Sequence, residues 1–459
     1  MRGVIVRLLV VAWVLVVYFP QPGSAQSDRV SQARQLLLEA SALIKDIPQI
    51  QQPSAAANIS GQLTRAGAMT DALAIVHLLK KPEDEGLAMG SVAWQLVHSG
   101  NAAQALSLLH EAKESQGRDV SYEQVAQLLG EKCDFEQALR VSHLIKEPNR
   151  LTETLVRLAV MQAKAGDRAN TGRILAEALD VAENAAKKDP GYATTFNQIA
   201  SAQAETGETP ETSLALRRFY AFAYSRKVET GDTSLLRDLA ETRAHLGDIS
   251  GAMQIVQELP DGSADLVYMR ISEERAQRAS MAEAIAAALE ISASNLRDLA
   301  LREIAIARRN DGSLNDSLEV IGKMSEPSDR HDAIAIVALE QAQSQDPTAY
   351  QTLQLWEATT GGGTKSFGKS RETAAVTYGL IGDFGSAERI LSSIQEPEAR
   401  QWPLWNLTRL LVNRERTQEA VALAQQEEAA LPRAYALLGT AEGILDRVES
   451  DAKAEPERH

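Results

Sequence analysis

The sequence predicts an all-α protein: a right-handed α-solenoid of about eleven helix-turn-helix repeats of ~33 residues, with a capping helix at each end. Three observations predict this fold. A column of small residues recurs along the chain, a turn centre follows each of them after seven residues, and most turn centres are 33 residues apart. In addition, no segment shows the alternation of apolar and polar residues that is typical of β-strands.

The repeat is defined by three columns of residues. The small-residue column comprises Ser60, Ala93, Ala126, Ala159, Ala200, Ala240, Ser272, Ala305, Ala338, Ala375 and Thr408. The turn centres are, in the same order, Gly67, Gly100, Cys133, Gly166, Gly207, Gly247, Ala279, Gly312, Gln345, Gly382 and Glu415. A second small column, five residues further on, comprises Ala72, Ala105, Ala138, Thr171, Thr212, Ala252, Ala284, Ser317, Tyr350, Ala387 and Ala420. Small residues allow two helices to pack closely, and glycine permits the left-handed backbone that ends a helix.

The first 25 residues are predicted to be a signal peptide. Arg2 and Arg7 accompany the apolar run 8–19, and the small residues 23–25 end the segment, so that cleavage is expected after Ala25. The alternative is that the segment is retained as a membrane anchor, although the apolar run is short for a bilayer span. This prediction implies a secreted or periplasmic protein with no membrane span after cleavage.

The remaining chain is predicted to be one repeat array, residues 26–449, followed by a flexible tail, residues 450–459. Residues 27–45 and 434–449 are expected to form the terminal capping helices. Within the array each unit begins with a helix that contains the small column, continues through the turn and ends with a second helix. Asp167, Asp248 and Asp383 follow three turn glycines and are predicted to cap the second helix.

Two stretches depart from the regular repeat. The repeats in residues 166–246 are longer than the others, and the second helix of the first one is expected to extend through Lys188, before Pro190. A glycine loop, residues 360–370, lengthens a later unit and is predicted to be an enlarged connection between repeats.

Charge and cysteine content exclude several classes of protein. The formal net charge is −15, and the loss of Arg2 and Arg7 with the signal peptide would make it −17. Such an acidic chain is not expected to bind nucleic acid or an anionic membrane. Cys133 is the only cysteine, so no internal disulfide can form, and the fold must be stabilised by packing. No cofactor is predicted.

The chain resembles the tetratricopeptide repeat family over roughly residues 50–440. Three steps from a turn glycine to an alanine match the family pattern, Gly100 to Ala105, Gly247 to Ala252 and Gly382 to Ala387, and Pro432 matches its closing proline. The family's Trp and Tyr positions are mostly aliphatic here, and most units have 33 residues rather than about 34. The resemblance implies a scaffold that binds proteins or peptides.

One helix of the irregular stretch is the best candidate for a partner contact. It concentrates aromatic and basic residues in a chain that is otherwise acidic and poor in aromatics, as is typical of interfaces. The candidate partner-binding residues are Arg217, Arg218, Tyr220, Tyr224 and Arg226. The alternative is that Phe219, Tyr220 and Phe222 fill a widened core.

Two motifs are weaker candidates for chemistry. Gly363, Gly368, Lys369 and Ser370 match a phosphate-binding loop, but that motif requires a preceding strand, and residues 353–356 are predicted to be helical. His77, His110 and His143 each lie ten residues past a turn centre. They are candidate metal ligands on three neighbouring repeats, although duplication of a repeat would also copy a histidine.

The sequence therefore predicts a secreted or periplasmic scaffold that binds proteins or peptides on its solenoid surface, with no catalytic residues and no enzymatic activity. No Ser-His-Asp set, cysteine cluster or dinucleotide fingerprint is present in a supporting context. The alternatives are a nucleotide- or metal-binding module that uses the two motifs above, and a purely structural spacer. Trp402 and Trp405, on either side of Pro403, are expected to pack in the core or to line a groove.

Overall fold

The fold is an all-α array of helix-turn-helix repeats, as the sequence predicts. The computed structural model describes residues 22–113, 115–207, 213–260, 262–278, 280–309, 314–359 and 368–454. Within these residues the regular structure consists of 24 α-helices and two short 3-10 helices, Ile44–Asp46 and Pro190–Thr194. The predicted signal peptide falls largely on residues 1–21, outside the described residues, and cleavage after Ala25 would remove the first four residues of α1 (Pro22–Ala42).

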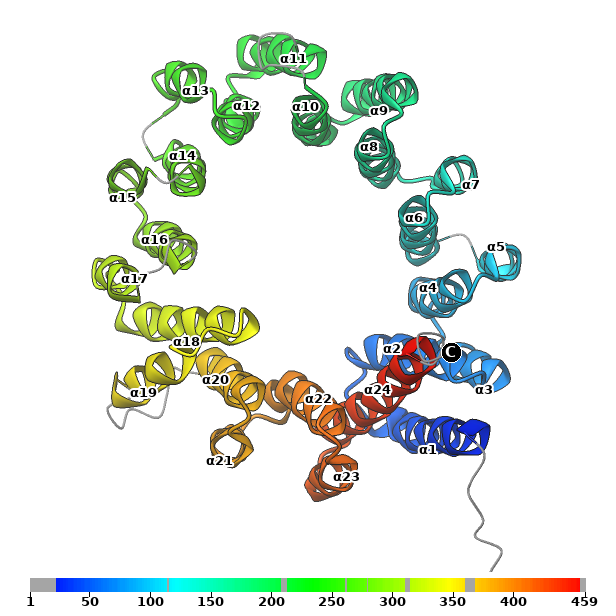
Figure 1. Cartoon of the computed structure of the whole chain (residues 1–459). Coiled ribbons are helices and arrows are strands. Elements are labelled where there is room, and N and C mark those ends of the chain that lie inside the picture. The colour runs from blue at the N-terminus through cyan, green and yellow to red at the C-terminus, as the bar shows by residue number, and fades with distance from the viewer. Residues whose placement is uncertain are drawn as a thin grey trace, which may run out of the picture.

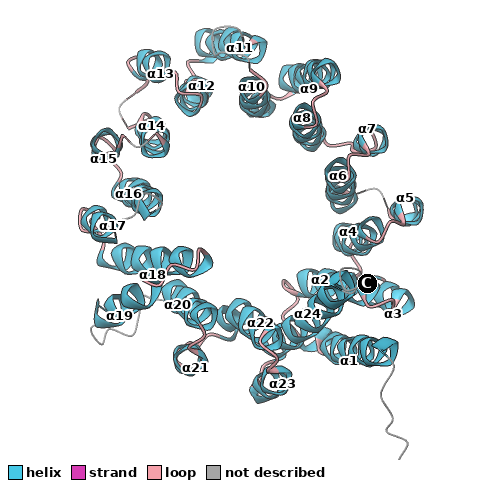
Figure 2. Ribbon diagram, viewed as in Figure 1, coloured by secondary structure: helices cyan, strands magenta, loops and turns pink. Residues whose placement is uncertain are grey.

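The helices form a closed ring with two layers, an inner layer of even-numbered helices and an outer layer of odd-numbered ones (Figures 1 and 2). The inner helices are α2 (Gln52–Arg65), α4 (Pro82–His98), α6 (Gln116–Glu131), α8 (Pro148–Lys164), α10 (Thr195–Glu205), α12 (Ser234–His245), α14 (Asp265–Gln277), α16 (Ser294–Arg309), α18 (Pro327–Gln343), α20 (Gly368–Ile381), α22 (Pro397–Asn413) and α24 (Ala430–Ala454). The outer helices after α1 are α3 (Met69–Val76), α5 (Ala102–Glu111), α7 (Phe135–Ser142), α9 (Arg168–Lys188), α11 (Leu214–Thr230), α13 (Ile249–Val256), α15 (Met281–Leu289), α17 (Leu314–Ile321), α19 (Ala349–Thr359), α21 (Phe384–Ser392) and α23 (Thr417–Gln426).

The repeat columns predicted from the sequence coincide with the packing of the helices. All eleven residues of the first small column are fully buried. Every turn centre among the described residues has a positive φ, including the non-glycine residues Cys133, Gln345 and Glu415, whose φ values are 62°, 57° and 66°. Ala279 and Gly312 lie outside the described residues. The turn position thus requires a left-handed backbone in each repeat where it can be checked, even where glycine is replaced.

One residue of the second small column does not have the predicted role. Tyr350 is exposed, whereas Ala349, Leu353 and Trp356 are buried. The buried face of α19 is therefore displaced by one residue from that of the other outer helices. The carboxylate of Asp346 accepts a hydrogen bond from the N–H of Thr348 and forms an additional turn before the helix. Helix α19 therefore begins at Ala349, and its buried face is displaced. Thr212, in the same column, lies outside the described residues.

The predicted aspartate caps are confirmed. The carboxylates of Asp167, Asp248 and Asp383 accept hydrogen bonds from backbone N–H groups three residues later, over 3.1, 2.9 and 3.0 Å. Asp134, which follows Cys133, caps α7 in the same way through the N–H of Gln137. Each carboxylate satisfies one of the N–H groups that a helix start leaves without a partner.

A second set of aspartates, which was not predicted from the sequence, connects neighbouring repeats. Asp119, Asp265 and Asp298 each lie seven residues before the small column. Each carboxylate accepts hydrogen bonds from two consecutive backbone N–H groups, 27 and 28 residues further along, just before the next inner helix. Burial alone would raise the pKa of Asp265, but the N–H groups of Ser292 and Ala293 outweigh burial and lower it. We call these residues the linker aspartates.

Replacing a linker aspartate by asparagine is expected to destabilise the array. In Asp298→Asn the amide oxygen can still accept one of the two N–H groups, from Ser325 and Glu326, but the other loses a charged acceptor. The expected loss in the free energy of unfolding is about 1–1.5 kcal/mol, measured by urea denaturation. Asp28→Asn, at an exposed position of α1, serves as a control outside this set. Equal stability of Asp298→Asn and the native protein would show that this linker aspartate contributes nothing to the free energy of unfolding.

The ring is closed by packing of the first helix against the last. The sequence predicts terminal helices that cap the two ends of an array, but here α1 lies in the outer layer beside α24 and α2 (Figure 1). No outer helix follows α24 among the described residues, and α1 occupies the corresponding position beside it. Helix α24 is longer than predicted, and residues 450–454 of the predicted tail belong to it.

The contact between the two ends, which we call the seam, combines apolar packing with ion pairs. Ile47 and Ala55 pack with Leu431 and Ala434 in a small buried cluster. The main polar contacts across the seam are ion pairs. They are Arg65–Asp446 (3.0 Å), Arg65–Glu449 (2.6 Å), Arg433–Glu39 (2.6 Å) and Arg29–Asp451 (2.6 Å). Most of these side chains are substantially exposed, so the apolar cluster and the buried residues of α1 provide most of the stability of the seam.

The irregular stretch contains the two longest helices of the outer layer after α1. Helix α9 extends to Lys188, as predicted, and a 3-10 helix connects it to α10. Phe196 of α10 stacks on Phe219 of α11, with ring centroids 5.7 Å apart. This pair of aromatic rings lies in the core between the two layers.

Candidate functional site

The aromatic-basic segment predicted as a partner contact lies on the outer helix α11. Phe219 and Ala223 are fully buried and attach α11 to the inner layer. Beside this buried face, Tyr220, Tyr224 and Val228 follow one another at intervals of four residues and therefore lie on one helical stripe, in which Tyr224 is half-buried. Tyr220 is 41% exposed, Val228 is almost fully exposed, and the rings of Tyr220 and Tyr224 are 4.5 Å apart. We call these three residues the α11 stripe.

The basic residues of this segment are neutralised by neighbouring carboxylates. Arg218 binds Glu183 of α9 over 2.6 Å, and Lys227 binds Glu258, just after α13, over 2.8 Å. Arg226 is 3.9 Å from Glu229 on its own helix. Arg217, the remaining predicted contact, also has an interaction within the fold. The structure therefore brings the predicted residues together on one helix of the outer layer, where Arg217 and Tyr220 are exposed and Tyr224 is half-buried.

Tyr224 is held in place by Glu258. Its hydroxyl donates to both carboxylate oxygens, over 2.6 and 2.7 Å. This hydrogen bond, together with the contact to Tyr220, raises the pKa of Tyr224, while Lys227 and Tyr224 lower the pKa of Glu258. Because the hydroxyl is fixed from the side of α13, the Tyr224 ring has a defined orientation beside Tyr220.

The three candidate histidines do not converge on a common point. His77 contacts Glu85 (3.3 Å), His110 contacts the Tyr122 hydroxyl (3.2 Å) and His143 contacts Glu177 (2.6 Å), each through one ring nitrogen. Within the described part of the chain, no group of three or more His, Cys, Asp or Glu side chains is arranged to hold a metal ion. Each histidine thus contacts a different side chain in its own repeat or the next.

The glycine-loop candidates also have a structural setting that differs from a phosphate-binding loop. Gly363 lies outside the described residues, helix α19 precedes the loop where the motif requires a strand, and α20 begins at Gly368. Lys369 is exposed, but Ser370 is buried and its hydroxyl lies 3.0 Å from Nδ1 of His331. Nε2 of His331 lies 3.3 Å from the carbonyl oxygen of Trp356. Burial lowers the pKa of His331, so this histidine is neutral where it links α18, α19 and α20.

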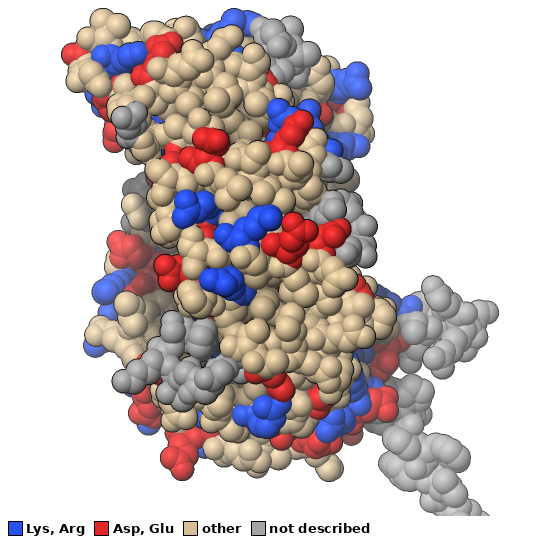
Figure 3. Space-filling model, turned by 90° about the vertical axis from the view of Figure 1, so that its left-hand side faces the viewer, with Lys and Arg blue, Asp and Glu red and all other residues tan. Residues whose placement is uncertain are grey.

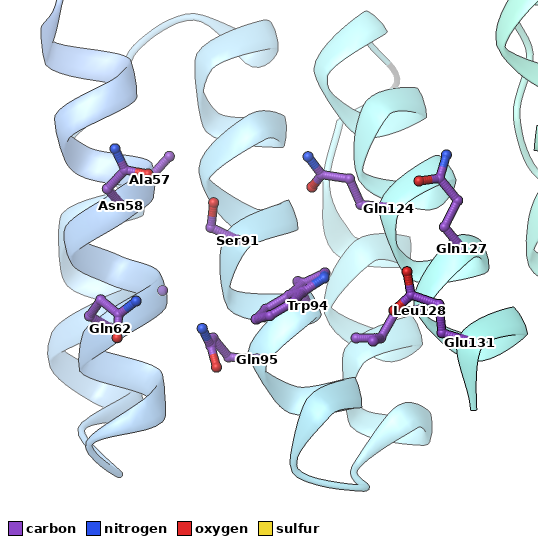
Figure 4. Close-up of a pocket in the computed structure, with 11 residues that line it drawn as sticks. Ala57, Asn58, Gln62, Ser91, Trp94, Gln95, Gln124, Gln127, Leu128 and Glu131 are labelled. Atoms are coloured by element: carbon purple, nitrogen blue, oxygen red, sulfur yellow. The ribbon is translucent and has the colours of Figure 1, made fainter. Parts of the chain in front are cut away.

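A groove on the inner layer was not predicted. It has a volume of about 300 Å³ and runs across α2, α4 and α6 (Figure 4). Its lining comes from these three inner helices and from none of α3, α5 or α7, so the groove opens away from the outer layer, toward the centre of the ring. We call it the inner groove.

The inner groove is rich in side-chain amides. Its lining residues are Ala57, Asn58, Gly61, Gln62, Ser91, Trp94, Gln95, Gln124, Gln127, Leu128 and Glu131. Close approach of the helices forms it: a Cβ at Gly61 would touch Ser91, and one at Gly90 would overlap Ser121. Gln127 is fixed at the edge, where it donates to Glu123 (3.0 Å) and accepts from Arg157 (3.1 Å).

The repeat columns contain a signal for this groove that the sequence analysis did not use. Asn58 and Gln124 lie two residues before the small column, and Gln62 and Gln95 lie two residues after it. Both positions face the same side of an inner helix, since they are four residues apart. Recurrence of amides at these positions in the first three repeats could have indicated a polar surface shared by three helices.

The tryptophans near Pro403 have different environments. The indole N–H of Trp405 donates to Glu442 over 2.8 Å, which connects α22 to α24. Trp402, at the start of the same helix, remains 36% exposed. Trp405 is therefore mainly a packing residue, and Trp402 lies at the surface.

Charges are interspersed on the face of the ring in Figure 3. Lys and Arg side chains lie next to Asp and Glu on this face, which shows no large area of one sign. Ion pairs within one helix, such as Arg270–Glu273 and Arg278–Glu274 of α14, also place opposite charges side by side. None of the helices in the described ranges is long and apolar enough to cross a membrane.

Comparisons with known proteins find only distant structural similarity. No protein-family model matches the chain, and no curated protein matches it. Ton1535 from Thermococcus onnurineus NA1 has 15% identity and a TM-score of 0.28, with 83% of this chain and 97% of that one covered. The APC/C hetero-tetramer Cut9-Hcn1 contains a chain with 11% identity and a TM-score of 0.24, covering 85% of this chain and 90% of that one. A circular tandem repeat protein with a novel repeat topology has 14% identity and a TM-score of 0.17, with coverage of 94% and 99%. These scores are low, so the description as a helical repeat protein depends on the repeat geometry itself.

Proposed function

We propose that this protein is a non-catalytic scaffold that binds another protein through the α11 stripe, and that it acts outside the cytoplasm. The observation that carries the proposal is the row formed by exposed Tyr220, half-buried Tyr224 and exposed Val228 on one outer helix. The predicted signal peptide, residues 1–25, supports the proposed location. A scaffold role suits an array in which each helix is fixed by its neighbours and presents its outer side chains in a constant arrangement.

The α11 stripe has the properties of an interface centre rather than of a core. Tyr220 and Val228 contribute little to the packing of the fold, because Ala215, Leu216, Phe219 and Ala223 are the buried residues of α11. Tyrosine provides a large, rigid contact area, and it is enriched among the residues that dominate binding energies. The nearby cations already pair with carboxylates, so the partner is expected to contribute apolar side chains that cover the tyrosine rings and Val228.

Site-specific photo-cross-linking tests this proposal. A photoreactive phenylalanine analogue at Tyr220 is expected to form a discrete adduct with a partner in native material, and Tyr224→Ala with Val228→Ser should abolish that adduct. Tyr350 is a matched control, since it is also a tyrosine on an outer helix and is 46% exposed. Thermal unfolding of each variant verifies that the array is intact. Equal adducts at positions 220 and 350, or an adduct that survives the double substitution, would contradict the proposed contact.

A further inference from the structure

We propose that the inner groove binds a neutral oligosaccharide that carries acetamido groups. This site is separate from the proposed protein contact, because α2, α4 and α6 lie in the inner layer and far from α11 around the ring (Figure 1). The inference depends on three observations: an exposed tryptophan with a supported ring, a lining amide that has no hydrogen-bond partner in the fold, and a lining with almost no charge.

Trp94 provides a flat apolar surface in an otherwise polar groove. It is 36% exposed and reaches from α4 toward Leu128 of α6 (Figure 4). One face of its indole stacks on His98, with ring centroids 5.3 Å apart and an interplanar angle of 11°. This stacking fixes the orientation of the indole and leaves its remaining surface available. The C–H face of a pyranose ring packs well on such an aromatic surface.

Gln95 places an amide in the groove without a partner in the fold. Its side chain is only 9% exposed, yet none of the hydrogen bonds among the described residues involves it. The amide atoms of Gln95 remain reachable from the groove, so their hydrogen-bonding capacity is available to a ligand. The carboxamide has two donors and one acceptor oxygen. An acetamido group, with one N–H and one C=O, can pair with both kinds of atom at once.

The remaining lining favours a ligand without charge. Lys and Arg are absent from the residues that line the groove, and Glu131 is their only acidic residue. A polyanion would meet this carboxylate without any compensating cation. Asn58, Ser91 and Gln124 instead offer groups that both donate and accept hydrogen bonds, as a rim of sugar hydroxyls requires.

A peptide is a poorer match to the same groove. Peptide recognition usually depends on apolar anchor side chains that are buried in desolvated pockets. Here only Ala57, Leu128 and the Trp94 ring are apolar, and the walls between them are amides and hydroxyls. The volume of about 300 Å³ accommodates a small part of a longer chain rather than a large ligand.

Calorimetric titration with chitotetraose, a β-1,4-linked tetramer of N-acetylglucosamine, tests the proposal. We expect saturable binding by the native protein and at least tenfold weaker binding by Trp94→Ala and by Gln95→Leu. Trp402→Ala is the matched control, since Trp402 is also a tryptophan on an inner helix with 36% exposure and lies outside the groove. Its affinity should equal that of the native protein. Gln124→Ala, at an exposed position of the lining, provides a variant with little risk to folding and should also weaken binding.

Two comparison ligands decide the chemical class. Cellotetraose has the same backbone without acetamido groups and should bind at least tenfold more weakly than chitotetraose. A neutral Gly-Ser-Asn peptide of twelve residues should not bind. No heat with chitotetraose, equal affinity in Trp94→Ala, or equal affinity for cellotetraose would overturn the proposal, and selective binding of the peptide would assign the groove to a protein ligand instead. Cross-linking at Tyr220 in the Trp94→Ala variant separates the two proposals, because loss of sugar binding should leave that adduct unchanged.

Discussion

Replacing Leu37 by arginine is expected to open the ring at the seam while the individual repeats remain folded. Leu37 is fully buried in α1, within the core that joins the first and last helices. Burial of each leucine side chain contributes about 1.5–3 kcal/mol, and a buried unpaired guanidinium would cost more than α1 can recover. Detachment of α1 therefore becomes favourable. Small-angle X-ray scattering should show a larger maximum dimension, and circular dichroism should show nearly unchanged helix content.

Leu38→Arg is the control for this experiment. Leu38 is the next residue of the same helix, but it is exposed, so a charge there remains in water. It should leave both the scattering profile and the helix content unchanged. Each repeat in such an array is stabilised by its neighbours, so opening the ring exposes two ends without removing the remaining interfaces. A compact scattering profile for a well-folded Leu37→Arg variant would show that α1 does not hold the ring closed.

The substitution Gly439→Leu is expected to destabilise the protein by about 3 kcal/mol or more. Gly439 lies where α24 crosses α22, and a Cβ there would overlap the carbonyl oxygen of Trp405 and the hydroxyl of Thr408. Thr408 belongs to the small-residue column, and its hydroxyl bonds the carbonyl oxygen of Ala436 across the same contact (3.0 Å). A backbone atom cannot move aside as a flexible side chain can, so the helices must separate. Chemical denaturation measures the loss.

Gly172→Leu distinguishes this steric effect from the effect of helix propensity. Gly172 also lies inside a helix, α9, but no atom is within 4 Å of the position that its Cβ would occupy. Leucine forms helices better than glycine, so this variant should gain about 0.5–1 kcal/mol. Opposite signs for the two variants would support close packing of α22 on α24. A gain for Gly439→Leu as well would show that this contact is looser than the structure indicates.

Local features of the fold could be predicted because they depend on residues that are close in the sequence. The turn centre requires a positive φ whatever residue occupies it, and the position seven residues earlier must be small where helices meet. The aspartate caps act within one helical turn. The failure at Tyr350 has a local cause too, since a single additional turn around Asp346 rotates the buried face of α19 by one residue.

The candidate sites depended more on which repeats come together. The sequence identified α11 as unusual, but it did not show that Glu183 and Glu258 would pair with Arg218 and Lys227 of this helix. The linker aspartates were missed because each carboxylate binds backbone groups of the following repeat. The inner groove was missed because three separate helices each contribute only two or three of its polar side chains.

The sequence by itself determined that this protein is a helical repeat array, where each repeat turns, and which residues lie between the helices. These properties follow from a helical period of 3.6 residues and from the conformation of single backbone positions. Only the tertiary structure decided that the array closes. Closure depends on a small rotation between neighbouring repeats that accumulates over the whole chain, until α24 meets α1 and the residues of the two ends, such as Arg65 and Asp446, come into contact.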